Sequence, residues 1–165
     1  SLNDKQACMD LVGKCNSCET ENEWRSVRLF IAESLACMKC GRRHYAPIPD
    51  AVADRVSENV EKLIARYGMV CFWGVNSFFY SLCKKLRIAD KGCVVCVDKS
   101  AIRHGLNILG GKLKPTEVIK HEKIGCVVVT VPQYYPSLAP SIKTEFPGVS
   151  KIVSIAELLS GVFAP

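Results

Sequence analysis

Four cysteines near the start of the chain have the residue type and spacing of a metal site. Cys15 and Cys18 form one Cys-x-x-Cys pair, and Cys37 and Cys40 form a second pair 18 residues later. Each two-residue gap lets two thiolates on one turn reach the same ion, and the interval is long enough for a strand, a turn and a returning strand. The pattern predicts a structural zinc ribbon, in which four thiolates leave no open position for water or substrate.

Other cysteines and one histidine near such patterns have simpler interpretations. Cys8 and His44 are alternative zinc ligands, although we expect both to be bystanders. Cys93 and Cys96 repeat the two-residue gap within a run of apolar residues. Because residues i and i+3 of a strand point to opposite faces, we expect these two cysteines to serve as small core residues rather than as a metal or redox pair.

A candidate ligand site lies where a later apolar run ends in glycine. Gly74, Val75, Asn76 and Ser77 connect that run to a helical stretch, at the place where a dinucleotide-binding fold has its Gly-x-Gly-x-x-Gly turn. Asn76 and Phe79 replace the second and third glycines, which disfavours a dinucleotide relative to other small ligands. Asn76 or Ser77 is expected to cap the helix that follows.

Two later strand ends add further candidate ligand-binding residues. Asp98 ends the next apolar run, and its carboxylate suits either a ribose hydroxyl or the cap of the following turn. Thr130, Gln133 and Tyr134 follow a third run at its carboxyl end, where ligands bind in open parallel sheets. No serine, cysteine or histidine motif indicates a nucleophile, so we assign no catalytic residues.

The elements that must position these residues divide the chain into three parts. Residues 1–48 are expected to form the zinc ribbon, residues 49–67 a connecting amphipathic helix, and residues 68–165 a Rossmann-like α/β domain. In the connecting helix, apolar residues recur on one face, with Asp50 expected as the N-cap and Gly68 as the stop.

The third part alternates short apolar runs with helical stretches. Strands that are apolar throughout and alternate with helices predict an open parallel sheet with helices on both faces. Residues 1–14 show only a weak helical pattern. The expected strands are 69–73, 93–97, 126–131 and 151–155, and the expected helices are 78–86, a short one near 115, 136–146 and a last one after the capping box at Ser154.

Composition limits the classes of function. The chain has 165 residues, is 48% hydrophobic and carries a formal net charge of +6, which does not by itself indicate a nucleic-acid partner. Ten cysteines without a signal-peptide pattern predict a reducing, cytoplasmic location. The uncharged stretch 67–83 is too short for a membrane span. Basic clusters at 42–44 and 84–87 are expected to be solvated surface, and a nucleic-acid partner stays the less favoured alternative.

Residues 67–161 resemble a family of Rossmann-like domains of sugar-modifying proteins. These are the N-terminal domain of sugar O- and N-acyltransferases and the C-terminal domain of sugar C-methyltransferases. The resemblance is carried by five segments, namely 69–74, 94–98, Gly-Gly-Lys-Leu-Lys-Pro at 110–115, 127–132, and Lys-Ile-Val-Ser-Ile-Ala-Glu-Leu-Leu at 151–159. It implies a Rossmann-like topology and a role in sugar or nucleotide processing.

Three functional hypotheses follow. The favoured one is an accessory or binding domain of a larger sugar- or nucleotide-processing protein, holding a nucleotide or nucleotide-sugar at the Gly74 turn beside a structural zinc ribbon. The second is an enzyme domain that uses NAD(P) or S-adenosylmethionine in the same crevice. The third is a nucleic-acid or protein interaction module led by the ribbon.

Overall fold

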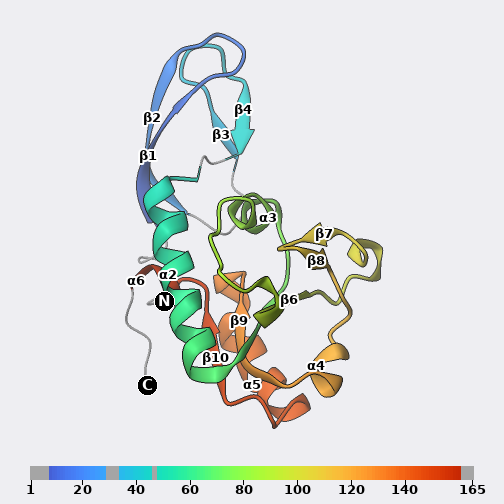
Figure 1. The fold of residues 1–165 in the computed structure, drawn as a ribbon. Helices are drawn as coiled ribbons and strands as arrows, with labels where there is room; N and C mark the ends of the chain where they lie inside the picture. The colour runs from blue at the N-terminus through green and yellow to red at the C-terminus, as the bar shows by residue number, and fades with distance from the viewer. Residues whose placement is uncertain (1–7, 29–33, 46–47, 161–165) are drawn as a thin grey trace.

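A small β module with the four cysteines precedes a larger α/β unit in the computed structural model, which describes residues 8–28, 34–45 and 48–160 (Figure 1). In this cysteine module β1 (Cys8–Lys14) pairs antiparallel with β2 (Glu21–Arg28), and β3 (Ser34–Ala36) with β4 (Arg43–Tyr45). The weak helical pattern of residues 1–14 was misleading, because residues 8–14 pair with β2; residues 1–7 lie outside the described residues. Each hairpin carries one cysteine pair at its turn.

The long helix α2 (Asp50–Tyr67) joins the two parts, as its apolar face predicts. Val56 and Val60 on that face are fully buried. The expected N-cap was wrong by one residue: Pro49 occupies the cap position, and Asp50 begins the helix and pairs with the Lys85 Nζ atom at 3.0 Å. Gly68 ends the helix as predicted, with φ of 81° and its N–H donated to the Ile64 carbonyl.

A four-stranded parallel sheet forms the centre of the α/β unit. Its strands are β5 (Met69–Trp73), β6 (Val94–Val97), β9 (Ile124–Val129) and β10 (Lys151–Ser154), in the spatial order β10-β9-β5-β6. After β5 the chain adds β6 on one side, and it then crosses to add β9 on the other. This reversal makes a switch point at the carboxyl ends of β5 and β9, where open α/β sheets bind ligands.

Helices cover both faces of this sheet, as the apolar strands predict. Val70 and Phe72 of β5 belong to a core shared with α2, α3 (Ser77–Cys83) and α6 (Glu157–Ser160). Cys71 and Trp73 point to the other face, against α4 (Val118–His121) and α5 (Tyr135–Glu145). Leu11 and Val27 of the cysteine module join the α2 core, so the two parts share one apolar layer.

A short hairpin at the β6 edge was not predicted. It consists of β7 (Asn107–Ile108) and β8 (Gly111–Lys112), and its turn residues Leu109 and Gly110 have φ of 48° and 78°. Two positive φ angles are typical of a two-residue hairpin turn. Two residues after the hairpin, the backbone of Lys114 donates to the Cys96 carbonyl and accepts from the Asp98 N–H. This segment therefore protects the otherwise open edge of β6.

The predicted capping box begins the last helix. The Ser154 N–H donates to Glu157 Oε2 at 2.7 Å, and the Ser154 hydroxyl accepts the Ala156 N–H at 3.3 Å. Within the described ranges, no helix has both the length and the apolar character that crossing a membrane requires.

Candidate functional site

The four cysteine sulfurs converge as the spacing predicts. The Sγ atoms of Cys15, Cys18, Cys37 and Cys40 all lie within 4.8 Å of one another. The Cys15–Cys40 and Cys18–Cys37 separations are both 3.6 Å. Four thiolates placed tetrahedrally at about 2.3 Å from zinc would be about 3.8 Å apart. The cluster can therefore hold a metal ion such as zinc with little rearrangement.

Two matching turns present these sulfurs. The Cys15 carbonyl accepts the Glu19 N–H, and the Cys37 carbonyl accepts the Gly41 N–H. Glu19 and Gly41 occupy equivalent positions after each pair, with φ of 61° and 76°. Gly41 adopts this positive φ without strain, whereas Glu19 is a non-glycine residue in the same backbone conformation.

Asn22 is a buried residue of the metal centre that the sequence pattern did not identify. Its Nδ2 atom lies 3.4 Å from Cys37 Sγ, and its Oδ1 atom accepts the Met38 N–H at 2.7 Å. Hydrogen bonds from the Cys40 backbone N–H and then from Asn22 lower the pKa of Cys37 to about 5. Donors of this kind favour the thiolate that a metal requires.

The other polar residues of the module have contacts within it. His44 Nε2 lies 3.3 Å from Cys15 Sγ, but neither His44 nor Cys8 belongs to the set of mutually close ligand atoms. Arg42 donates to the Ser17 hydroxyl, and Arg43 to the hydroxyl and carbonyl of Ser34. The basic cluster at 42–44 thus ties the two hairpins together.

A cavity of about 560 Å³ lies at the switch point of the sheet, and we call it the crevice. It brings together predicted residues from the ends of β5, β6 and β9. Ser77 instead lines an adjoining cavity, and Thr130 is fully buried beneath the turn. The crevice is lined by Trp73, Gly74, Val75, Asn76, Asp98, Lys99, Arg103, Val129, Val131, Gln133, Tyr134, Ser137 and Leu138.

Gly74 and Thr130 form a close contact at the floor of the crevice. Gly74 has φ of 96°, and a Cβ atom added there would lie 3.1 Å from Thr130 Oγ1. The Thr130 hydroxyl is within hydrogen-bond distance of the Trp73 and Gly74 carbonyls, at 3.0 and 2.5 Å. Thr130 therefore supports the turn from below, and its predicted contact with a ligand stays a prediction.

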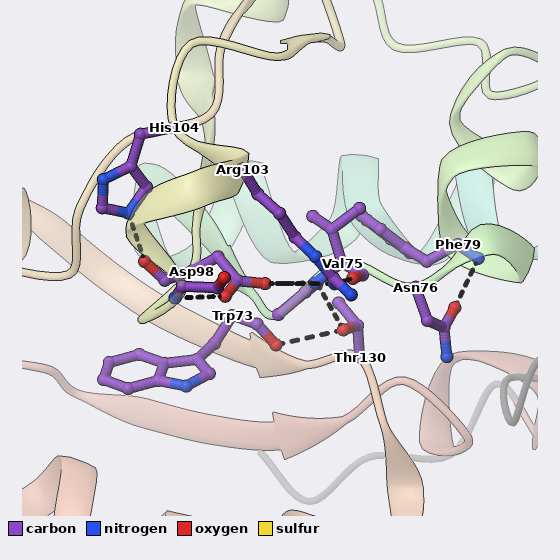
Figure 2. A network of polar contacts seen from close by, with 10 residues as sticks. Trp73, Val75, Asn76, Phe79, Asp98, Arg103, His104 and Thr130 are labelled. Atoms are coloured by element: carbon purple, nitrogen blue, oxygen red, sulfur yellow. Dashed lines mark hydrogen bonds and ion pairs between the residues drawn. The ribbon is translucent and has the colours of Figure 1, made fainter.

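Asp98 connects β6 to the Gly74 turn (Figure 2). Its Oδ2 atom accepts the Val75 N–H at 3.0 Å, and its Oδ1 atom accepts the Ser100 N–H at 2.7 Å. Arg103 Nη1 lies 3.8 Å from Oδ2 and also donates to the Val75 carbonyl. The capping interpretation of Asp98 matches this geometry, and a bond to ribose stays a prediction.

Asn76 caps α3, one of the two alternatives that the sequence left open. Its Oδ1 atom accepts the Phe79 N–H at 2.9 Å. Phe78 and Phe79 are 4% and 0% exposed and belong to the α2-side core. Neither phenylalanine lines the crevice. Phe79, which stands where the third glycine of the motif would be, therefore leaves the crevice open.

Two cations on the crevice wall were not among the predicted site residues. Lys99 places its Nζ atom 5.9 Å from the centre of the Trp73 ring. The guanidinium of Arg103 reaches the Gly74 turn from the 3-10 helix η2 (Ala101–Arg103). Both follow Asp98 within five residues, so a basic run after a strand-end aspartate was the signal available in the sequence.

The core role predicted for two further cysteines is confirmed for one of them. Cys96 is buried in β6, but the prediction for Cys93 was wrong. Cys93 ends the 3-10 helix η1 (Lys91–Cys93) before the strand begins, and it is only half-buried because its thiol lies 3.4 Å from the Asp90 Oδ2 acceptor. Burial raises the pKa of Cys96 and of Cys126 to about 12, which keeps both thiols neutral. Among the described residues, only the quartet of the cysteine module forms a possible metal cluster.

The fold and site together define an α/β protein with a four-stranded parallel sheet, a crevice at its switch point and an attached four-cysteine cluster. No protein-family model, curated protein or solved structure matches the chain.

Proposed function

We propose that the α/β unit is a Rossmann-like domain that holds a nucleotide or nucleotide-sugar in the crevice, beside a structural zinc ribbon. In this proposal the chain is an accessory or binding part of a larger sugar- or nucleotide-processing protein. The observation that carries it is the crevice itself, which lies at the carboxyl ends of the parallel strands and has a cationic wall. Its volume of about 560 Å³ is in the range of small-molecule sites.

The chemistry of the lining supports an anionic ligand with a ring. Lys99 and Arg103 suit phosphate oxygens, and Arg103 can offer two parallel donors. Tyr134 is 57% exposed at the rim, where its ring can stack on a base or a sugar. Asp98, the carboxylate among the lining residues, accepts two backbone N–H groups and lies 3.8 Å from Arg103 Nη1, so Lys99 is the cation of the described lining that no carboxylate pairs with.

The Gly74 turn supports a nucleotide better than a dinucleotide. The Gly74 N–H donates to the Val97 carbonyl, and the Val75 N–H donates to Asp98. A dinucleotide-binding turn directs such amides at a pyrophosphate. In this chain the phosphate partners are instead the side chains of Lys99 and Arg103, which leaves NAD(P) and S-adenosylmethionine as the less supported ligands.

Calorimetric titration of the zinc-loaded chain tests the proposal. The panel contains nucleoside mono- and diphosphates, nucleotide-sugars, NAD(P) and S-adenosylmethionine. We expect a nucleotide or nucleotide-sugar to bind, and Lys99→Ala to weaken it about tenfold, which corresponds to about 1.4 kcal/mol. Lys120→Ala is the matched control, because Lys120 also lies 5.9 Å from an aromatic ring, that of Phe146, outside the crevice. Absence of binding across the panel would refute the proposal.

A further inference from the structure

A second cavity, of a size similar to the crevice, is not used by the function proposed above. It has a volume of about 580 Å³ and lies between α3 and the β7–β8 hairpin. Three lysines line it and no carboxylate does. We call it the lysine cavity; its lining comprises Tyr80, Cys83, Lys84, Leu86, Lys91, Asn107, Ile108, Leu109, Gly110, Gly111 and Lys112.

Within the described part of the chain, no carboxylate forms an ion pair with Lys84, Lys91 or Lys112. Asp90, next to Lys91 in the chain, uses its oxygens to accept from the Gly92 N–H and the Cys93 thiol. Three exposed ammonium groups around one hollow attract an anion.

Local geometry holds these lysines around the cavity. Gly110 has positive φ, and a Cβ atom there would lie 3.2 Å from Lys91 Cδ, so the absent side chain leaves room for the Lys91 stem. Lys112 follows on the returning strand of the same hairpin. Lys84 places its Nζ atom 4.7 Å from the centre of the Tyr80 ring. The C-cap of α3, the 3-10 helix Lys91–Cys93 and the hairpin thus contribute one cation each.

A third cavity of about 320 Å³ has lining residues in common with both of the others. It shares Val75, Asn76 and Arg103 with the crevice and Tyr80 with the lysine cavity. The three cavities therefore follow one another through shared lining residues, with cations at both ends, and we call them together the groove. Each volume is in the range of one small-molecule site, so an occupant of the whole groove must be an extended molecule.

We propose that this groove binds a single-stranded nucleic acid, of which the nucleotide in the crevice is one unit. The inference rests on the proposed function, since it extends the ligand of the same crevice. A phosphodiester chain carries one negative charge per nucleotide, which matches cations spread along the groove, and an unstacked base can stack on the exposed ring of Tyr134. Three separate cavities can each receive one nucleotide of a flexible single strand, whereas a duplex presents a regular surface that does not enter such cavities.

Fluorescence anisotropy with labelled oligonucleotides tests this inference on the zinc-loaded chain. Oligo-dT and oligo-U of about four and about eight nucleotides are compared with the mononucleotide and with a duplex. We expect affinity to rise with length and single strands to bind more tightly than the duplex. The double variant Lys91→Ala/Lys112→Ala should weaken oligonucleotide binding about tenfold or more. It should also lower the slope of log affinity against log salt concentration by about 1.4, because each phosphate contact to a single strand contributes about 0.7 to that slope.

The control separates a specific groove from general attraction. Lys120→Ala/Lys123→Ala removes the same charge from a different cavity, beside α4, and should leave oligonucleotide binding unchanged. Equal losses in the two double variants, or affinity independent of length, would overturn the inference. Mononucleotide binding that depends on Lys99 without any gain from length would leave the proposed function intact. Oligonucleotide binding without mononucleotide binding would refute only the proposed function.

Discussion

The carboxylate of Asp98 accepts the backbone N–H of Val75 at 3.0 Å, which joins the end of β6 to the turn after β5. The same side chain accepts the Ser100 N–H and is 13% exposed. A residue predicted as a ribose partner therefore also holds the shape of the crevice. Stability and ligand binding must be measured together to separate its two roles.

Replacing Asp98 should destabilise the protein even without a ligand. Asp98→Ala leaves the Val75 and Ser100 N–H groups without their acceptor, and we expect a loss of about 1–3 kcal/mol in the free energy of unfolding. Urea denaturation measures it, with Asp54→Ala on the exposed side of α2 as the control. An Asp98→Ala variant as stable as the Asp54→Ala variant would mean that the two hydrogen bonds do not hold the turn.

Gly74 should tolerate no side chain, because it combines positive φ with the contact to Thr130. We expect Gly74→Ala to lower the free energy of unfolding by about 1–3 kcal/mol. Gly148→Ala provides the comparison, since nothing lies within 4 Å of the added Cβ atom and its φ is not positive. Thermal unfolding of both variants decides the matter, and equal midpoints would contradict the described turn.

Cys93 should react with alkylating reagents slowly near neutral pH. The hydrogen bond to Asp90 raises the pKa of this thiol, so less of the reactive thiolate is present below the raised pKa and the rate increases as the pH rises. Asp90→Asn removes the negative charge, and we expect faster alkylation of Cys93 at about pH 8. Peptide mass spectrometry after iodoacetamide treatment gives the rate; identical pH profiles would disprove the influence of Asp90.

Metal removal should affect the cysteine module before the sheet. Trp24 lies in the module, where its Nε1 atom donates to the Ala36 carbonyl, and Trp73 lies in β5. A structural zinc site contributes about 10 kcal/mol or more to the folding free energy of its module, so a chelator should unfold the cysteine module. We therefore expect a chelator to change the fluorescence of a Trp73→Phe variant, in which Trp24 is the remaining tryptophan. The converse Trp24→Phe variant should respond much less.

Metal analysis completes this test. We expect about one zinc ion per chain, lost in Cys37→Ser and retained in Cys93→Ser. A Trp24 signal that does not respond to zinc removal would rule out a metal-dependent fold for the module.

The sequence predicted what depends on spacing and periodicity. The cysteine quartet, the apolar face of α2 and the parallel strands each follow from one repeated pattern, and all three are present. Element ends shifted by one to three residues; β9, for example, begins at Ile124 and not at 126, and α3 ends at Cys83 and not at 86. Such shifts arise because strand ends are set by pairing with neighbours rather than by the apolar residues themselves.

The residues and elements that could not be predicted from the sequence are those whose role depends on contacts formed only in the folded chain. Asn22 is a polar residue in a strand, and only the folded module shows that its amide joins Cys37 to Met38. Lys99 and Arg103 belong to no motif, and only the fold places them beside the Trp73 ring and the Val75 carbonyl. The β7–β8 hairpin carried a usable signal in Gly110 and Gly111, but two-residue strands have too few residues for a periodic pattern.

Binding of a nucleotide-type ligand in the crevice at the switch point can be mapped residue by residue. Two-dimensional ¹H–¹⁵N NMR titration with the tightest nucleotide of the panel does this. We expect the amide signals of Gly74, Asn76 and Lys99 to shift with a common dissociation constant, while signals of α4 and of the cysteine module stay in place. Shifts confined to other surfaces, or none at saturating nucleotide, would contradict binding in the crevice.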